Sequence, residues 1–242
     1  MTVDIVIRTY SKDIEWLNYA LRSIHKYVTG YRHVIVAIPS EDVKLLRHLS
    51  AEKVVGVADL QDGYLGQQMT KMQAWKLTNA DAIVFWDSDV VATQPIDIRS
   101  EYFEGDKIIR YKTRYSSLGS ACPWQPIVAK SVGFTPEWEY MRRMPLVYWR
   151  STLEKCEQSM VDLHGCSLEY YINSQPYRHF SEFNTIGAFS ETHDPEGYLF
   201  VDTESIDMPP CKVDQCWSWG GITDEVRCKF ATYGAPYLNV YL

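Results

Sequence analysis

Two carboxylates stand one residue apart in VFWDSDVV, residues 84–91, where an apolar run ends. Asp87 and Asp89 would repel each other and resist burial unless a cation neutralised them. In an extended segment both side chains lie on one side of the chain and Ser88 faces away. Two such oxygen donors supply half of a Mg²⁺ or Mn²⁺ site, with water and a substrate diphosphate completing it. The alternative is an ordinary solvated turn, because Asp and Ser favour turns.

A lysine and two glutamines occupy one helical segment shortly before these aspartates. GYLGQQMTKMQAWKL, residues 63–77, has the apolar spacing of a helix with one buried face. Lys71 can therefore point at the same sheet edge as the aspartates and neutralise phosphate or a leaving group. Gln67 and Gln68 are suitable partners for sugar hydroxyls. The alternative for Lys71 is a solvated surface position.

A third carboxylate stands at the start of a later helix, expected over residues 181–190. Ser181 is typical of an N-cap, and Glu182 then lies in the first turn, where the helix N-terminus favours its ionised form. Asn184 is a weaker candidate for the same pocket. The alternative for Glu182 is the favourable charge placement that any helix start offers.

The elements that position these groups follow from the hydrophobic pattern of the first 90 residues. Strand-like and helix-like segments alternate, which predicts parallel strands with right-handed crossovers. Ligands of such sheets bind beyond the carboxyl ends of the strands, where Asp87 and Asp89 lie. The apolar fourth strand is expected to be central. The expected strands are 3–7, 33–39, 53–60 and 81–89, and the expected helices include 16–24, with Ser11 or Asp13 as N-cap, 41–49 and 63–77.

The remainder of the chain alternates less regularly. Strands are expected at 107–112 and 125–132, and helices near 136–160, 181–190 and 223–230. We see no internal repeat, linker or low-complexity tract, so we expect one domain spanning residues 1–242.

Composition excludes several classes of protein. A net charge of −7 over 242 residues argues against a general affinity for nucleic acid or anionic membranes. No apolar run is long enough to span a membrane, and MTVDIVIRTY is not a signal peptide, so we expect a soluble cytoplasmic protein. The six cysteines include no CxxC pair, which favours reduced thiols and disfavours a zinc site. The lack of GxGxxG disfavours a dinucleotide cofactor.

The D-x-D at the end of a central strand resembles that of GT-A glycosyltransferases. DIVIRTYSKDIEWLNYALRSI is similar to their first strand, nucleotide-binding loop and first helix, and DGYLGQQMTKMQAWKL to the donor-side helix of several bacterial and viral members. The chain also resembles the small algal-virus enzymes that build capsid glycans. The resemblance covers residues 1–95 well and the remainder loosely.

The resemblance implies a GT-A (Rossmann-like) α/β fold of three layers, α/β/α, around a central, mostly parallel sheet. Residues 1–95 would bind the nucleotide sugar, and 96–242 would form the acceptor side. Thr9 and Tyr10 would line the nucleoside pocket, with Asp59 near the base or ribose. Asp87, Ser88 and Asp89 would contact the donor, and the two aspartates would hold Mn²⁺ or Mg²⁺. The alternatives are that Thr9 caps a helix, Tyr10 packs and Asp59 closes a turn.

The family also suggests roles in the second half of the chain. Glu182 would be the general base of an inverting enzyme, or would stabilise or attack the anomeric centre in a retaining one. The lack of a paired acidic motif at Glu182 favours retention. Many members complete the metal site with a late histidine, but a helix would place His193 about 15 Å from Glu182. The third ligand would then be Asp214, Asp224 or water.

Sugar rings stack on aromatic side chains, and Trp217 and Trp219 precede two glycines that allow close approach to a ligand. We therefore expect these tryptophans to bind the acceptor. The leading hypothesis is a metal-dependent transferase that moves a hexose or deoxyhexose from a UDP-sugar to a glycan hydroxyl. The alternatives are a sugar-nucleotide nucleotidyltransferase, disfavoured because RTYSKD has no glycine, and a noncatalytic carbohydrate-binding protein.

Overall fold

The central sheet has five strands, four of them parallel. A computed structural model describes residues 1–49, 52–60 and 62–233 of the chain, except the side chains of Ala121 and Trp219. β11 runs antiparallel to β5 at one edge. This arrangement confirms the predicted α/β class with a mostly parallel sheet. The strand order is β11 (Leu146–Trp149), β5 (Ala82–Phe85), β1 (Val3–Arg8), β3 (His33–Pro39) and β4 (Lys53–Val57).

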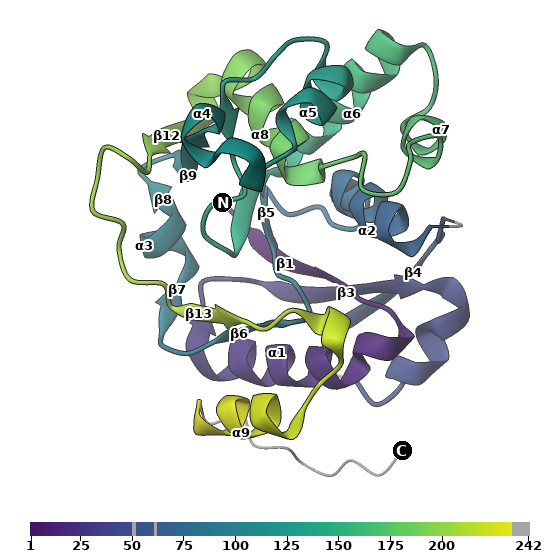
Figure 1. The fold of residues 1–242 in the computed structure, drawn as a ribbon. Coiled ribbons are helices and arrows are strands. Elements are labelled where there is room, and N and C mark those ends of the chain that lie inside the picture. Colours follow the sequence, from purple (N-terminus) through teal and green to yellow (C-terminus); the bar gives the residue numbers. More distant parts are fainter. Residues whose placement is uncertain (50–51, 61, 234–242) are drawn as a thin grey trace.

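Helices cover both faces of this sheet (Figure 1). α1 (Ile14–Tyr27) lies on one side, and α2 (Gly63–Met72), α6 (Arg150–His164) and α8 (Glu182–His193) lie on the other. All four residues of β5 are buried, as predicted for a central apolar strand. The sheet and its helices share one large hydrophobic core, which fixes the strand ends that carry the polar residues described below.

A second, smaller sheet belongs to the later half of the chain. β9 (Lys107–Arg114) pairs with β8 (Phe103–Glu104) and β10 (Trp138–Glu139) antiparallel, and with β12 (Tyr198–Asp202) parallel. The strand predicted at 107–112 is thus confirmed. The short helices of this half are α3 (Ile98–Tyr102), α4 (Tyr115–Leu118), α5 (Gln125–Val132) and α7 (Leu168–Asn173).

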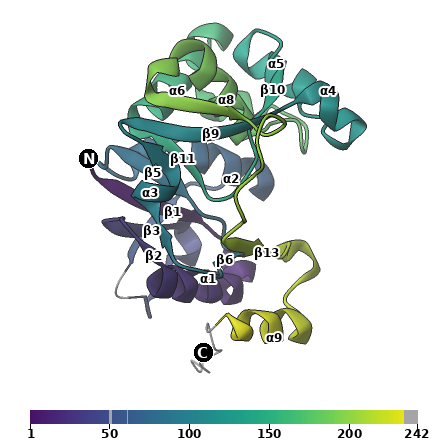
Figure 2. The ribbon, with the colours of Figure 1, turned by 90° about the vertical axis from the view of Figure 1, so that its left-hand side faces the viewer.

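The chain then returns to the first half. After β12 it runs along the side of the molecule to β13 (Val213–Gln215), which pairs antiparallel with β6 (Val90–Ala92) directly after the D-x-D (Figure 1). α9 (Asp224–Thr232) then lies against α1 in both views (Figures 1 and 2), where Phe230 packs on Trp16 and Tyr19. A further short pair joins β2 (Val28–Thr29) to β7 (Ile96–Asp97).

Three predictions of secondary structure are wrong. The strand expected at 125–132 is α5, because Pro126 suits the first turn of a helix and Gly133 ends it in the left-handed conformation, φ 81°. The helix expected at 41–49 is a 3₁₀ turn, Ser40–Leu46. The helix expected near 136–160 begins only at Arg150, because β10 and β11 occupy part of that range.

Other predicted elements are present with adjusted ends. The strands expected at 53–60 and 81–89 end at Val57 and Phe85. The helix expected over 63–77 ends at Met72 and is followed by a 3₁₀ turn, Ala74–Lys76. The helices expected at 181–190 and 223–230 are α8 and α9.

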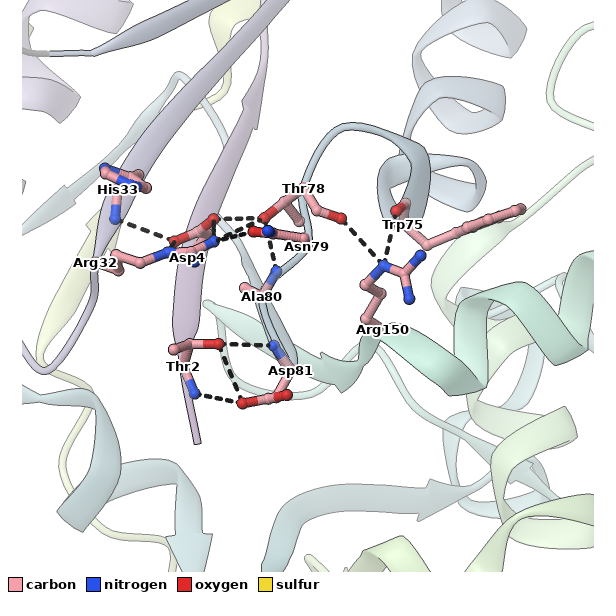
Figure 3. Close-up of polar contacts among 10 residues, drawn as sticks. All are labelled: Thr2, Asp4, Arg32, His33, Trp75, Thr78, Asn79, Ala80, Asp81 and Arg150. Carbon is pink, nitrogen blue, oxygen red and sulfur yellow. Dashed lines mark hydrogen bonds and ion pairs between the residues drawn. The ribbon is translucent and has the colours of Figure 1, made fainter.

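The amino ends of the strands are joined by a polar network around Asp4, which is completely buried (Figure 3). Its carboxylate accepts hydrogen bonds from Arg32 Nε at 3.0 Å, Arg32 Nη2 at 2.8 Å and the His33 amide at 3.1 Å, and another from Thr78 Oγ1. Asp4 lies on β1, His33 begins β3, and Thr78 lies in the connection to β5. The network therefore aligns three strands at the edge opposite the D-x-D.

All six cysteines are free thiols. Within the described residues, no helix is both long and apolar enough to cross a membrane.

Candidate functional site

The D-x-D forms a turn at the carboxyl end of β5. The Val90 amide donates to the Asp87 carbonyl at 3.1 Å, so the chain reverses here and the expectation of an extended segment is wrong. The three side chains meet three different groups. Asp87 faces Lys71, Ser88 Oγ lies 3.5 Å from Asp13 Oδ2, and Asp89 faces the end of β13 and the residues that follow it. Ser88 is thus turned toward the loop that follows β1.

Lys71 joins the first aspartate to the carboxylate at the start of α8. Its Nζ lies 2.8 Å from Asp87 Oδ1 and 3.2 Å from Glu182 Oε1, and 4.7 Å from the centre of the Phe183 ring. Lys71 is only 4% exposed, so it is not a solvated lysine. Burial alone would lower the pKa of Lys71, but the charges of Asp87 and Glu182 outweigh burial and raise it. The ammonium group is therefore charged at neutral pH.

Asp89 is held by the last third of the chain. Gln215 Nε2 donates to its Oδ1 at 3.2 Å, and the Ser218 amide donates to its Oδ2 at 3.2 Å. Burial, and then the charge of Asp87, raise the pKa of Asp89 to about 6, against the opposing effect of these donors and of Lys71. Burial and the neighbouring negative charge thus both disfavour the ionised form of Asp89.

The two aspartates fit a divalent cation. Their carboxylates are the hard oxygen donors that Mg²⁺ and Mn²⁺ prefer. Asp87 Oδ1 is buried and, among the described residues, accepts no well-aligned hydrogen bond beside its ion pair with Lys71. A cation would offset the negative charge of the two carboxylates. Further ligands would come from water and substrate, because the described residues form no cluster of three or more His, Cys, Asp or Glu suited to a metal.

The late residues considered as a third ligand lie elsewhere. Asp214 Oδ2 is paired with Lys229 Nζ at 2.6 Å and with the Tyr233 hydroxyl at 2.9 Å. Asp224 pairs with Arg227 and its side chain is 93% exposed. His193, at the end of α8, packs against Phe134 and Phe189. The structure brings none of them to the D-x-D.

Arg8, the last residue of β1, connects Asp59 to α2. Its Nη2 lies 3.0 Å from Asp59 Oδ1, and its Nε donates to Thr70 Oγ1 at 3.3 Å. Gly66 permits this arrangement, because a Cβ there would lie 2.4 Å from Asp59 Oδ1. Sequence reasoning did not include Arg8 in the site. Its position at the carboxyl end of the first strand was the available signal.

The loop after β1 supplies Thr9, Tyr10 and Asp13. Thr9 Oγ1 is buried without a hydrogen-bond partner among the described residues, and Thr9 does not cap α1, whose N-cap position is Asp13. Asp13 does not use its side chain to cap the helix. Its carboxylate instead meets Tyr10, Ser88 and Ser218, and burial raises its pKa. Tyr10 is 43% exposed, and burial and then Asp13 raise the pKa of its hydroxyl.

The remaining sequence candidates differ in their surroundings. Gln68 is buried and its Oε1 has no hydrogen-bond partner among the described residues, whereas Gln67 is half-buried. The side chain of Asn184 has a structural role, because its Oδ1 accepts a hydrogen bond from the Tyr140 amide at 2.8 Å. Trp217 is 64% exposed. Trp219 lies in a 3₁₀ turn, Ser218–Gly220, but its side chain lies outside the described part of the structure.

Comparisons with known proteins give little beyond this geometry. The sequence matches no protein-family description and no curated protein. Among solved structures, the chain is similar to the glycosyltransferase GlyE in Streptococcus pneumoniae TIGR4, with 12% identity and a TM-score of 0.43. The match covers 83% of this chain and 45% of GlyE, so the chain spans less than half of that structure.

Proposed function

We propose that the protein is a metal-dependent glycosyltransferase that moves a hexose or deoxyhexose from a UDP-sugar to a glycan hydroxyl, with retention favoured. The observation that carries the proposal is a set of buried oxygens at the carboxyl edge of the sheet that have no hydrogen-bond partner among the described residues. They are Thr9 Oγ1 and Gln68 Oε1; among the described residues, Asp87 Oδ1 has no partner besides its ion pair with Lys71. Each unpaired buried polar group costs about 1–3 kcal/mol, so a polar ligand is expected to contact them.

The donor side of this site combines cation-binding and nucleotide-binding groups. Asp87 and Asp89 would hold Mn²⁺ or Mg²⁺, which neutralises the diphosphate when bound. Lys71 adds a fixed positive charge beside the departing phosphate. Thr9, Tyr10 and Asp59 would contact the nucleoside, and Arg8 holds Asp59 in place.

Glu182 is 5% exposed, and its Oε1 lies 3.2 Å from Lys71 Nζ. Its ion pair holds the carboxylate beside Lys71 of α2, which also contacts Asp87 of the D-x-D turn. In a retaining reaction this carboxylate would stabilise positive charge at the anomeric carbon or attack it. Gln67 and Gln68, one and two residues beyond Gly66 on α2, would bind the sugar hydroxyls.

Calorimetric titration of Mn²⁺ and UDP tests the binding part of the proposal. We expect each to strengthen the binding of the other, and we expect Asp89→Ala to abolish this coupling. Asp224→Ala is the matched control, because Asp224 is an exposed aspartate whose one ion-pair partner in the described part of the chain is Arg227. Equal coupling in all three proteins would refute the metal site.

Hydrolysis of UDP-sugars without acceptor tests catalysis. A transferase is expected to release UDP slowly in the presence of Mn²⁺, at a rate that depends on Glu182. A noncatalytic binder would release none, and a nucleotidyltransferase would instead release pyrophosphate from a nucleoside triphosphate. Either of these results would replace the proposed function.

A further inference from the structure

A polar groove of about 430 Å³ lies beside the candidate site, between the first turn of α2 and the segment that follows α7. It lies outside the set of residues predicted from the sequence. Its lining residues are Asp62, Gly63, Leu65, Asn173, Gln175 and Tyr177.

The groove presents hydrogen-bonding groups that the protein leaves unused. The side-chain amide of Asn173 makes no hydrogen bond with any described residue. Gln175 donates from Nε2 to the Tyr171 carbonyl at 2.9 Å, which leaves its Oε1 without a partner in the described chain. Asp62 caps α2: its Oδ1 accepts a hydrogen bond from the Tyr64 amide at 2.9 Å. Its Oδ2 accepts none from any residue that the structure describes. Such donors and acceptors suit hydroxyl groups, because a hydroxyl group can both donate and accept a hydrogen bond.

Tyr177 adds an aromatic surface to these polar groups. It is 61% exposed, although its ring meets Tyr64 edge-on with centroids 5.4 Å apart. The next residue, Arg178, has φ 61°, a left-handed conformation that is costly for a residue with a side chain. The backbone therefore bears strain where it presents Tyr177 beside the groove.

Tyr64 links this groove to the Lys71–Glu182 pair. Its ring packs on Tyr177, and Tyr64, Gln68 and Lys71 follow one another at i, i+4 and i+7 on α2, so they lie along one face of that helix. Burial, and then the charge of Glu182, raise the pKa of Tyr64 to about 12. A ligand in the groove would therefore lie at the start of the helix that carries Lys71, the partner of Glu182.

We propose that this groove binds a neutral sugar ring of the glycan acceptor, stacked on Tyr177 and hydrogen bonded by Asn173, Gln175 and Asp62. The inference rests on the proposed function for the role of the sugar as acceptor. The groove is lined by amides, one carboxylate and one tyrosine, and no lysine, arginine or histidine lines it among the described residues. This lining suits a neutral polyol and not a phosphate.

The test is saturation-transfer NMR with a panel of neutral disaccharides: lactose, maltose, cellobiose and N,N′-diacetylchitobiose. Donor and metal are left out, so the result does not depend on transferase activity. We expect at least one disaccharide to bind the wild-type chain at millimolar concentration. Tyr177→Ala should weaken that binding on the order of tenfold, through loss of one stacking surface, and Asn173→Ala should also weaken it.

Tyr170→Ala is the matched control, because Tyr170 is a 69% exposed tyrosine on α7 that does not line the groove. Unchanged binding in Tyr177→Ala, equal weakening in Tyr170→Ala, or no binding of any panel member to the wild type would overturn the inference. Coupled binding of Mn²⁺ and UDP is measured on the same proteins. Its absence would count against the proposed function alone, and its retention in Tyr177→Ala would show that the donor site is intact.

Discussion

Lys71 Nζ lies 3.2 Å from Glu182 Oε1, although 111 positions separate the two residues in the chain. The same ammonium group is 2.8 Å from Asp87 Oδ1. One buried cation thus connects the D-x-D turn to the start of α8, and the two halves of the candidate site depend on one another. Removing one member of a buried ion pair leaves an uncompensated charge in a low-dielectric interior.

Lys71→Met should therefore destabilise the fold strongly. With Asp87 and Glu182 left to repel each other, we expect the free energy of unfolding to fall by about 3–5 kcal/mol. Urea unfolding measures the change. Lys76→Met is the control, because Lys76 pairs with Glu157 at a 44% exposed position and should contribute less than about 1 kcal/mol. Similar losses in both variants would contradict the structural role given to Lys71.

Two glycines of α2 should respond differently to alanine. A Cβ on Gly66 would lie 2.4 Å from Asp59 Oδ1 and 3.1 Å from the Leu60 amide nitrogen, so Gly66→Ala should force Asp59 away from Arg8. A Cβ on Gly63 meets no described atom within 4 Å, and Gly63→Ala should be neutral or stabilising because alanine favours helices.

Under the proposed function, Gly66→Ala should weaken UDP binding on the order of tenfold, as expected when a charge-assisted hydrogen bond is lost. Calorimetry with UDP and Mn²⁺ measures this, and thermal unfolding shows whether both variants remain folded. If Gly63→Ala weakened UDP binding as much as Gly66→Ala, the effect would not come from Asp59.

The sequence predicts the parts of this site that depend on local pattern. An apolar strand followed by acidic residues placed Asp87 and Asp89 at the carboxyl edge of the sheet, and helical spacing oriented Lys71 toward the same edge. The contacts of Asp89 were not foreseeable from pattern, because Gln215 is 126 positions away and belongs to a three-residue strand. Helix α5 was missed because its β-branched residues suggested a strand, whereas Pro126 and Gly133 favoured a helix.

The buried network at the opposite edge predicts a pH dependence of stability (Figure 3). Burial alone would raise the pKa of Asp4, but hydrogen bonds from Arg32 and Thr78 and the nearby positive charge outweigh it, so the pKa lies below its ordinary value of 3.8. A carboxyl group with a lowered folded-state pKa stabilises the fold above its unfolded pKa. That contribution is lost as the pH falls through the folded pKa.

Asp4→Asn should therefore reduce the free energy of unfolding at neutral pH by about 2–3 kcal/mol, as for a charge-assisted hydrogen bond. The difference between the variant and the wild type should shrink as the pH falls below about 4. Urea unfolding at a series of pH values measures both curves. A difference that stayed constant down to the acid transition would show that the charge of Asp4 contributes nothing.

The contact between Gln215 and Asp89 leads to a prediction about cation affinity. Gln215 Nε2 is one of two donors that orient Asp89, and it opposes the rise of the Asp89 pKa. In Gln215→Leu this carboxylate should lose its orientation and hold a proton more tightly. Substitution of a residue that orients a metal ligand typically lowers metal affinity about 10- to 100-fold. Mn²⁺ binding in the presence of UDP should therefore weaken by about that factor.

Asp214→Asn provides the matched control for Gln215→Leu. Asp214 is the preceding residue of β13, but its carboxylate meets Lys229 and Tyr233 and not Asp89. This variant should lose some thermal stability, because that ion pair joins β13 to α9, and should keep its Mn²⁺ affinity. Calorimetry and thermal unfolding of the two variants separate the effects. Equal Mn²⁺ affinity in both would mean that Asp89 binds no cation or needs no support from Gln215.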